Sequence, residues 1–160
     1  MSYATAVIVL SDRAAAGTRA DLCIPVMREM LGDLFEIQAA VILPDEAASL
    51  QAKLIELADA GSVELILTSG GTGLSPRDRT PQATSAILDY DVPGIPEAMR
   101  SASLHQVKAA MLSRAVAGVR NKTLIVNLPG NPSAVRDCLQ TVLPALPHAL
   151  ELLRDAHPDG

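Results

Sequence analysis

The sequence predicts a single α/β domain, built as a three-layer sandwich around a mostly parallel β-sheet. Short apolar segments rich in β-branched residues alternate with helical patterns, and this alternation is typical of parallel sheets covered by helices. Hydrophobic residues make up 49% of the chain and aromatic residues only 2%, so aliphatic side chains must build the core between the helices and the sheet. A length of 160 residues suits one domain rather than two.

The predicted parallel strands are four short apolar segments, each bounded by turn residues. They span Thr5 to Leu10, Ile37 to Leu43, Glu64 to Thr68 and Thr123 to Asn127. A further strand over Arg114 to Val119 is predicted to pair antiparallel with the last of these, through a turn at residues 120–122.

Helical patterns occupy the intervals between the strands. The predicted helices span Ala20 to Leu31, Glu46 to Ala60, Pro81 to Leu88, Ile95 to Val107 and Pro132 to about Arg154. Thr80 and Asn131 each precede a proline and are predicted as helix caps, with proline as the first helical residue. Pro144 and Pro147 interrupt the last pattern and are expected to kink or break that helix. We place the domain at residues 1–156 and a frayed tail at 157–160.

The net charge of the chain and the shortness of its apolar segments argue against nucleic acids and membranes as partners. The formal net charge is −5, and no cluster of Lys and Arg is interleaved with aromatic residues, so a nucleic-acid partner is not expected. The apolar segment Thr5 to Leu10 is too short for a signal peptide, and no run approaches the roughly 20 apolar residues of a membrane span. We therefore expect a cytoplasmic protein that binds no membrane.

The cysteines and histidines form no recognisable nucleophile or metal set. Cys23 and Cys138 lie far apart in helical patterns, without a neighbouring Cys or His at the spacing of a zinc site. We expect both to be buried thiols. His105, His148 and His157 are scattered along the chain and are expected to be structural.

The most informative motif runs from Thr68 to Pro81. A predicted strand leads into a glycine cluster, Gly70, Gly71 and Gly73, and Asp78 follows between two arginines. Glycines let the backbone turn tightly and bring bare N–H groups against an anion. The motif has neither the Lys-Ser/Thr pair of a Walker A loop nor the G-x-G-x-x-G spacing. Taken alone, a glycine cluster after a strand is more often a plain tight turn, and it is the Arg-Asp-Arg-Thr-Pro continuation that favours phosphate binding.

Polar residues follow every predicted parallel strand. In an open parallel sheet, ligands lie outside the carboxyl ends of the strands. The segments at these ends are Ser11-Asp12-Arg13, Pro44-Asp45-Glu46, the glycine loop reaching Asp78, and Leu128-Pro129-Gly130-Asn131-Pro132. Three carboxylates are thus expected at one edge. For Asp12 and Asp45 a plain turn role remains an alternative, and Asp45 is also a candidate N-cap.

Carboxylates beside a phosphate-binding loop are unfavourable unless a cation lies between them. A Mg²⁺ ion held by one or two carboxylates and by substrate phosphates is the usual solution. The pattern therefore predicts Mg²⁺-dependent phosphate chemistry, without identifying the substrate.

Over nearly its whole length, the chain resembles the MogA/MoaB family of molybdenum cofactor biosynthesis. The pairing of the motif from Gly70 to Pro81 with the motif from Leu128 to Pro132 is the most specific part of the resemblance. It implies the α/β fold of a molybdopterin-binding domain and assembly as a homotrimer or as a hexamer of two trimers. It also implies transfer of AMP from Mg²⁺-ATP to molybdopterin with release of pyrophosphate, and a molybdate-insertion enzyme as a possible partner.

The resemblance also implies roles for individual residues. Asp45 and Asp78 match the family's two functional aspartates and are the implied catalytic and Mg²⁺-binding residues, with Asp78 the stronger candidate. The implied substrate- and nucleotide-binding residues are Ser11, Asp12, Ser69, Gly70, Gly71, Thr72, Gly73, Pro129, Gly130, Asn131 and Ser133. A pterin phosphate is already ionised at neutral pH, so this reaction needs alignment and charge screening rather than a Ser, Cys or His nucleophile.

Three other functions are consistent with parts of the sequence. A non-catalytic molybdopterin-binding or scaffolding protein of the same family would bind nucleotide without releasing pyrophosphate. A molybdate-insertion enzyme carries a similar domain inside a much longer chain. A small-molecule kinase or nucleotidyltransferase, suggested by the phosphate loop alone, would use ATP without molybdopterin.

Overall fold

The computed structural model describes residues 1–155 and contains one six-stranded sheet with the strand order β2-β1-β3-β6-β5-β4. The strands are β1 (Tyr3–Leu10), β2 (Phe35–Leu43), β3 (Leu65–Ser69), β4 (Tyr90–Asp91), β5 (Ala117–Arg120) and β6 (Thr123–Leu128). Strands β2, β1, β3 and β6 pair in parallel, and β5 runs antiparallel to both β4 and β6. The predicted parallel strands and the hairpin are confirmed, whereas β4 was not expected from the sequence.

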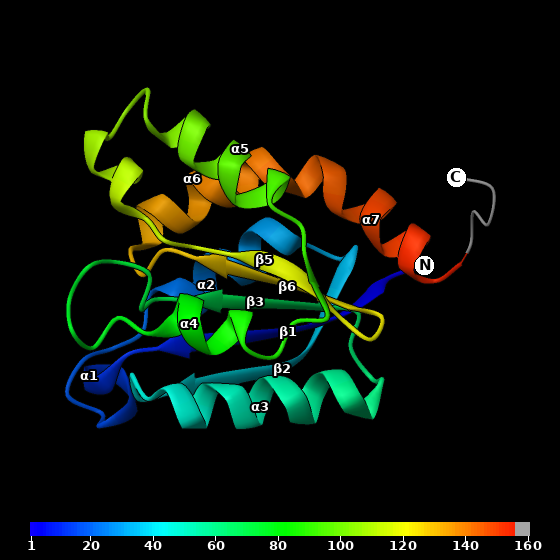
Figure 1. The fold of residues 1–160 in the computed structure, drawn as a ribbon, viewed down its shortest axis with the longest axis horizontal. Coiled ribbons are helices and arrows are strands. Elements are labelled where there is room, and N and C mark those ends of the chain that lie inside the picture. Colours follow the sequence, from blue (N-terminus) through cyan, green and yellow to red (C-terminus); the bar gives the residue numbers. More distant parts are fainter. Residues whose placement is uncertain (156–160) are drawn as a thin grey trace.

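Helices cover both faces of this sheet, which confirms the three-layer sandwich (Figure 1). One face carries α2 (Cys23–Leu31), α5 (Gly94–Ser103), α6 (Pro132–Val142) and α7 (Leu146–Leu153), and the other carries α3 (Ala47–Ala60) and α4 (Thr80–Ser85). Successive strand residues alternate between the two cores, because side chains point to opposite faces with a period of two. Val7 and Leu67 pack in the first core, and Ile8 and Ile66 in the second.

Several helix boundaries differ from the sequence prediction for local reasons. Helix α2 begins at Cys23 rather than Ala20, because the Asp21 carboxylate accepts hydrogen bonds from the N–H groups of Cys23 (3.0 Å) and Ile24 (2.9 Å). Thr80 is not the cap of α4 but its first residue, after Arg79. Its hydroxyl donates to the Gly70 carbonyl instead (2.8 Å).

Other helical segments are shorter than their patterns. Helix α5 ends at Ser103 and is followed by a 3₁₀ helix, η1 (Lys108–Leu112). The predicted break in the last helix is confirmed, since a second 3₁₀ helix, η2 (Leu143–Ala145), separates α6 from α7 at Pro144. A four-residue helix, α1 (Asp12–Ala15), occupies a segment expected to be a turn. The predicted tail at 157–160, with His157, lies outside the described residues.

Cys23 and Cys138 are both buried thiols, as the sequence predicts. Burial raises the pKa of each thiol, since it disfavours the charged thiolate. Within residues 1–155, no helix combines the length and apolar character that crossing a membrane requires.

An ion pair ties the last helix to the start of the sheet. The Glu64 carboxylate accepts hydrogen bonds from the Arg154 guanidinium and from the N–H group of Ala4 (3.0 Å). The Arg154 guanidinium also lies 4.6 Å from the centroid of the Tyr3 ring. Only about a quarter of each side chain of this ion pair remains exposed, at 29% for Arg154 and 25% for Glu64, so water screens this interaction less than it screens a surface pair.

Glu64→Gln is expected to lower the free energy of unfolding at pH 7 by about 1 to 2 kcal/mol, because it removes a charge-assisted hydrogen bond. Hydrogen bonds from Arg154 lower the pKa of Glu64 in the folded chain. This stabilisation is therefore complete above the ordinary glutamate pKa and is lost as the pH falls through the folded pKa. Urea unfolding at pH 7 and at pH 3 should show the difference between variant and wild type shrinking in acid. The exposed Lys53–Glu56 pair provides the control, since Glu56→Gln should change little at either pH.

Candidate functional site

The carboxyl ends of the parallel strands meet at one edge of the sheet. Figure 1 shows α1 and the loop between β3 and α4 together at this edge. Two cavities open there, and their walls contain most of the residues that the sequence singles out. The glycine-rich loop after β3 and the turn after β6 form the boundary between these cavities.

The glycine loop packs directly against the turn after β6. The N–H group of Gly70 donates to the Leu128 carbonyl (3.1 Å), and the Ser69 hydroxyl donates to the Pro129 carbonyl (2.8 Å). A Cβ atom on Gly130 would lie 3.2 Å from the Cα atom of Gly70. The two most specific motifs of the sequence, about 60 residues apart, therefore form one continuous backbone surface.

Gly70 adopts φ +106°, in the region that favours glycine, and a Cβ atom there would overlap the carbonyl oxygen of Leu10. The expectation of bare N–H groups along the whole loop is wrong for Gly70, because its N–H group is used by the Leu128 carbonyl. Within residues 1–155, the N–H groups of Gly71, Thr72 and Gly73 make no hydrogen bond. These three donors are the ones that remain for an anion.

The first two carboxylates of the edge hold each other in place. The N–H group of Asp12 donates to the Asp45 carboxylate (3.2 Å), and the N–H group of Asp45 donates to the Asp12 carboxylate (2.9 Å). Arg77 forms a two-pronged ion pair with Asp12, at 2.7 and 3.0 Å. Hydrogen bonds from Arg77 lower the pKa of Asp12. Asp45 is not the N-cap of α3, since that position belongs to Glu46.

Among the three carboxylates of this edge, Asp45 is the one whose negative charge is disfavoured by its surroundings. Its pKa is raised, first by burial and then by the negative charges of Asp12 and Asp78. Arg77 only partly offsets this repulsion, since its guanidinium is engaged by Asp12. Asp78 accepts a hydrogen bond from the N–H group of Ser75 (3.0 Å), which closes a tight turn. A half-buried carboxylate facing a second one is an arrangement that a cation would stabilise.

Asp45→Asn is expected to raise the free energy of unfolding at pH 7 by about 0.5 to 1 kcal/mol. The amide removes the buried charge, and its oxygen can still accept from the N–H group of Asp12. Because the folded pKa of Asp45 is raised, the destabilisation by its charge is present at neutral pH and is relieved as the pH falls through that pKa. Urea unfolding at pH 7 and at pH 4 is the measurement. A stability gain that persists undiminished at pH 4 would contradict the electrostatic cause.

The smaller cavity, of about 200 Å³, is polar, and its wall contains the carboxylates of Asp21, Asp45 and Asp78. The predicted site residues that line it are Ser11, Asp45, Ser69, Gly70, Gly71, Asp78 and Gly130. The Ser11 hydroxyl already accepts from the N–H group of Ala14 at the start of α1. Asp12 lines neither cavity and acts instead on Asp45 and Arg77.

The larger cavity, of about 560 Å³, has a mainly apolar wall between α5, η1 and α6. The predicted site residues that line it are Thr72, Gly73, Pro129, Asn131 and Ser133. Asn131 caps α6 as predicted, because its side-chain oxygen accepts from the N–H groups of Ser133 (2.9 Å) and Ala134 (3.3 Å). Met99 and Leu112 supply apolar surface opposite this turn. The volume lies in the range of small-molecule sites, which are mostly apolar with a few polar groups.

Sequence reasoning missed three residues of the edge. Arg19 and Cys23 line the polar cavity, and the Cys23 thiol lies 3.4 Å from the Gly130 carbonyl. Arg114 donates hydrogen bonds to the glycine loop from a segment about 40 positions later. No local pattern marks any of them, because their positions depend on how distant segments pack.

The residues present fit a Mg²⁺ ion that is shared with a substrate. Asp45 and Asp78 line one cavity together with Gly71, whose N–H group makes no hydrogen bond to the residues that the structure describes, and the repulsion between the two carboxylates would be relieved by a cation. Among residues 1–155, no group of three or more His, Cys, Asp and Glu could hold a metal ion. Phosphate oxygens and water would therefore complete the coordination.

The chain is similar to known proteins over most of its length. The family model described as a probable molybdopterin binding domain matches residues 6–148. A molybdopterin adenylyltransferase of Helicobacter pylori strain J99 is 40% identical over 151 residues, which cover 92% of this chain and 85% of that protein. The molybdopterin adenylyltransferase of Escherichia coli K12 is 44% identical over 139 residues, covering 84% and 71%. The crystal structure of the molybdopterin biosynthesis enzyme MoaB from Thermus thermophilus superposes with a TM-score of 0.90, at 47% identity, covering 94% and 96%.

Proposed function

The chain belongs to the MogA/MoaB family, whose probable molybdopterin binding domain it carries, and we infer from this premise that it is a molybdopterin adenylyltransferase. It is a nucleotidyltransferase of molybdenum cofactor biosynthesis. We assign this activity to the polar cavity because Asp45 and Asp78 lie there, beside the turns at Gly70 and Gly130, which pack against each other.

The reaction joins two anions. An oxygen of the molybdopterin phosphate forms a bond to the α-phosphorus of ATP, and the bond from that phosphorus to the oxygen bridging to the β-phosphorus breaks. Pyrophosphate leaves with the electron pair of that bond, and the product is adenylylated molybdopterin. The attacking phosphate is already ionised, so the site must align the two anions and screen their repulsion rather than remove a proton.

Backbone donors of the loop carry out part of this screening. The N–H groups of Gly71, Thr72 and Gly73 bind phosphate oxygens of the nucleotide. Arg19, which lines the polar cavity together with Gly71, adds positive charge to this otherwise carboxylate-rich edge. The turn from Pro129 to Ser133 binds the second substrate. Support for these assignments comes from the position of each group on the cavity walls.

Asp78 and Asp45 would hold Mg²⁺ together with phosphate oxygens. When bound, this ion supplies positive charge to the phosphates during transfer. Asp78 is directed by its hydrogen bond from Ser75, and Asp45 by its hydrogen bond from the N–H group of Asp12. Asp12 and Arg77 thus act as supports for the carboxylates.

The apolar cavity provides room for a ring system next to the polar one. Its wall combines apolar groups from α5 and η1 with polar groups of Thr72, Asn131 and Ser133. A pterin has an apolar face and a polar edge, so this wall suits it better than the carboxylate-lined cavity does. The phosphate of such a substrate would then point toward the boundary formed by Gly73 and Pro129.

The deciding experiment measures pyrophosphate release from Mg²⁺-ATP, with and without molybdopterin, and detects adenylylated molybdopterin by mass. We expect both products only when molybdopterin is present. Tight binding of molybdopterin without pyrophosphate would assign the chain to a non-catalytic binding or scaffolding role. Consumption of ATP without molybdopterin would instead indicate an unrelated kinase or nucleotidyltransferase.

We also propose that the chain forms a homotrimer, or a hexamer of two trimers. Apolar side chains that are exposed near the end of α5 and along η1, outside the apolar cavity, support self-association, and they include Leu104 (37% exposed) and Met111 (60%). Light scattering would measure the number of subunits. Use of ATP favours the cytoplasm as the site of action, and a molybdate-insertion enzyme is the partner expected to receive the product.

A further inference from the structure

We propose that Arg114 is a positioning residue that holds the catalytic loop, residues 73–78, in the shape that places Asp78. The effect of Arg114 on kcat rests on the proposed function, whereas its effect on the shape of the loop does not. Arg114 lies in the segment between η1 and β5, and it is half-buried. Neither cavity includes it in its wall, so its action must pass through other residues.

Arg114 reaches both ends of the catalytic loop. Its Nε donates to the carbonyl of Gly73 (2.9 Å) and its Nη2 donates to the carbonyl of Asp78 (2.6 Å). Its own N–H group donates to the carbonyl of Thr72 (2.9 Å). One residue therefore holds three carbonyl oxygens, and the two at the guanidinium lie at the first and last positions of the loop. The guanidinium therefore links the first residue of the loop to the last.

Apart from Arg114, the loop is held to the domain by the ion pair of Arg77 with Asp12, whose side chains are 57% and 43% exposed. The Asp78 carboxylate accepts from the N–H group of Ser75, and the N–H group of Asp78 donates to the carbonyl of Ser75. Leu74, Ser75 and Arg77 are exposed, so core packing contributes little to holding them. The hydrogen bonds of the half-buried Arg114 therefore connect the loop to the packed part of the domain, whereas the Arg77–Asp12 pair is more open to water.

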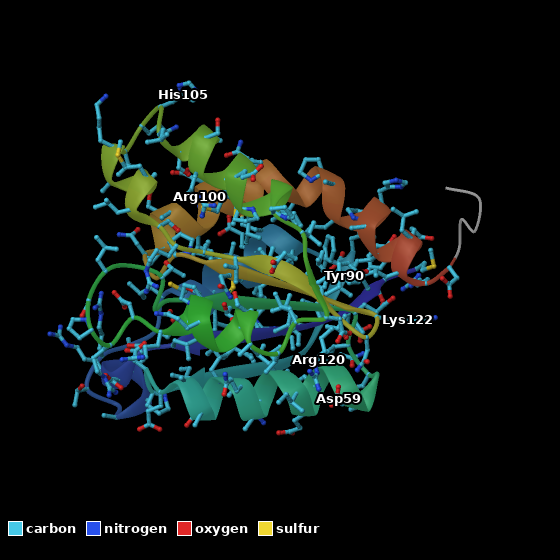
Figure 2. The ribbon with its side chains drawn as sticks, viewed as in Figure 1. Asp59, Tyr90, Arg100, His105, Arg120 and Lys122 are labelled. Atoms are coloured by element: carbon cyan, nitrogen blue, oxygen red, sulfur yellow. The ribbon has the colours of Figure 1, made fainter. Side chains whose placement is uncertain are left out.

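The segment that carries Arg114 is itself fixed on both sides. The Arg100 guanidinium, on α5, donates to the carbonyls of Ser113 (3.3 Å) and Ala115 (3.0 Å), which flank Arg114. Figure 2 labels Arg100 between α5 and the sheet. The side-chain oxygen of the buried Asn127, on β6, accepts from the N–H group of Val116 (3.1 Å). Arg114 is therefore a rigid support rather than a free surface arginine.

The geometry requires a guanidinium at this position. Two carbonyl oxygens are bound by two different nitrogen atoms of one planar group, and arginine presents its donors in such a fixed fork. A lysine ammonium is a single point charge and cannot occupy both donor positions at once. Arg114→Lys keeps the charge and removes the fork, which separates the two effects.

Arg120 offers a matched control. It is also half-buried, and it also donates to a main-chain carbonyl, that of Ile87 (2.9 Å). Its ion pair with Asp59 lies at the end of the sheet away from the catalytic loop, as Figure 2 shows. Arg120→Ala should therefore affect stability without affecting the loop.

The first test is hydrogen exchange of the N–H groups of Ser75 and Asp78, which both donate hydrogen bonds within the catalytic loop, in the protein without substrates. We expect exchange to become at least roughly tenfold faster in Arg114→Ala, as one lost charge-assisted hydrogen bond implies, and to remain at the wild-type rate in Arg120→Ala. Unchanged exchange in Arg114→Ala would overturn the proposal. This measurement decides the role of Arg114 in the loop even if the wild-type protein proves inactive in adenylyl transfer.

The second test measures kcat at saturating substrates. We expect Arg114→Ala to lower kcat by roughly 10- to 100-fold, the size of effect that a displacement of about 1 Å can produce, and added guanidinium ion to restore part of it. Arg114→Lys should remain impaired. Full activity of Arg114→Lys would overturn the requirement for a fork, and wild-type kcat in Arg114→Ala would overturn the positioning role. Far-ultraviolet circular dichroism and thermal unfolding of each variant would show whether loss of the fold is the cause.

Discussion

Asp78→Asn is expected to lower kcat for adenylyl transfer by roughly 100-fold or more, because it removes a negative charge that would hold Mg²⁺ against the reacting phosphates. The amide oxygen can still accept from the N–H group of Ser75, so the turn and the stability of the domain should be kept. The measurement is steady-state release of pyrophosphate over a Mg²⁺ titration, with thermal unfolding of the same preparation. If the metal assignment is right, the variant will need a higher Mg²⁺ concentration than the wild type to reach half of its own maximal rate.

Asp59→Asn is the control for this prediction. Asp59 is an aspartate of a distant ion pair with Arg120 (Figure 2), and its replacement leaves the charge of the site unchanged. We expect wild-type kcat from this variant. Wild-type turnover in Asp78→Asn at saturating Mg²⁺-ATP would show that the charge of Asp78 is not required, and the assignment would fail.

Gly70→Ala is expected to destabilise the domain by about 3 kcal/mol or more, since it combines a disfavoured backbone conformation with a steric overlap. The added methyl group would meet the Leu10 carbonyl oxygen at φ +106°. The loop can avoid that overlap only by moving away from β1 and from Gly130, which would also open the site. Urea unfolding measures the stability, and pyrophosphate release measures the accompanying loss of activity.

Gly61→Ala separates the backbone effect from the steric one. Gly61 also has a positive φ, +71°, at the end of α3, but nothing lies within 4 Å of the position of its Cβ atom. Only the cost of a left-handed alanine remains, about 1 to 2 kcal/mol, and kcat should be unchanged. Equal losses in the two variants would mean that contact with Leu10 contributes nothing.

The parallel strands were predictable because each is a short apolar run that ends in turn residues. The same reasoning placed Asp45 and Asp78 at one edge, since all carboxyl ends of parallel strands meet there. Strand β4 could not be found this way, because Tyr90 and Asp91 are exposed and too few to show a period. Its existence depends on pairing with Gly118 and Val119 of β5.

Tertiary contacts explain what local rules missed at the site. Thr80 looks like a cap in sequence, yet its hydroxyl is taken by the Gly70 carbonyl ten positions earlier. The N–H group of Gly70 looks available, yet it is taken by Leu128 on a strand that follows much later in the chain. Arg114 lies in no recognisable motif, and its role depends on hydrogen bonds to carbonyl groups about 40 residues away in the sequence. Capping and turn rules consider only near neighbours, so they cannot anticipate such pairings.

The buried thiols make the chain convenient for site-specific labelling. Cys23 and Cys138 are at most 6% exposed, and their raised pKa keeps them protonated, so alkylating reagents should react slowly with both in the native state. A single cysteine introduced at the exposed Ser62, between α3 and β3, would then take up a fluorophore without removal of either native thiol. That position lies at the amino end of β3, so a dye there would leave the chemistry at the opposite edge of the sheet undisturbed.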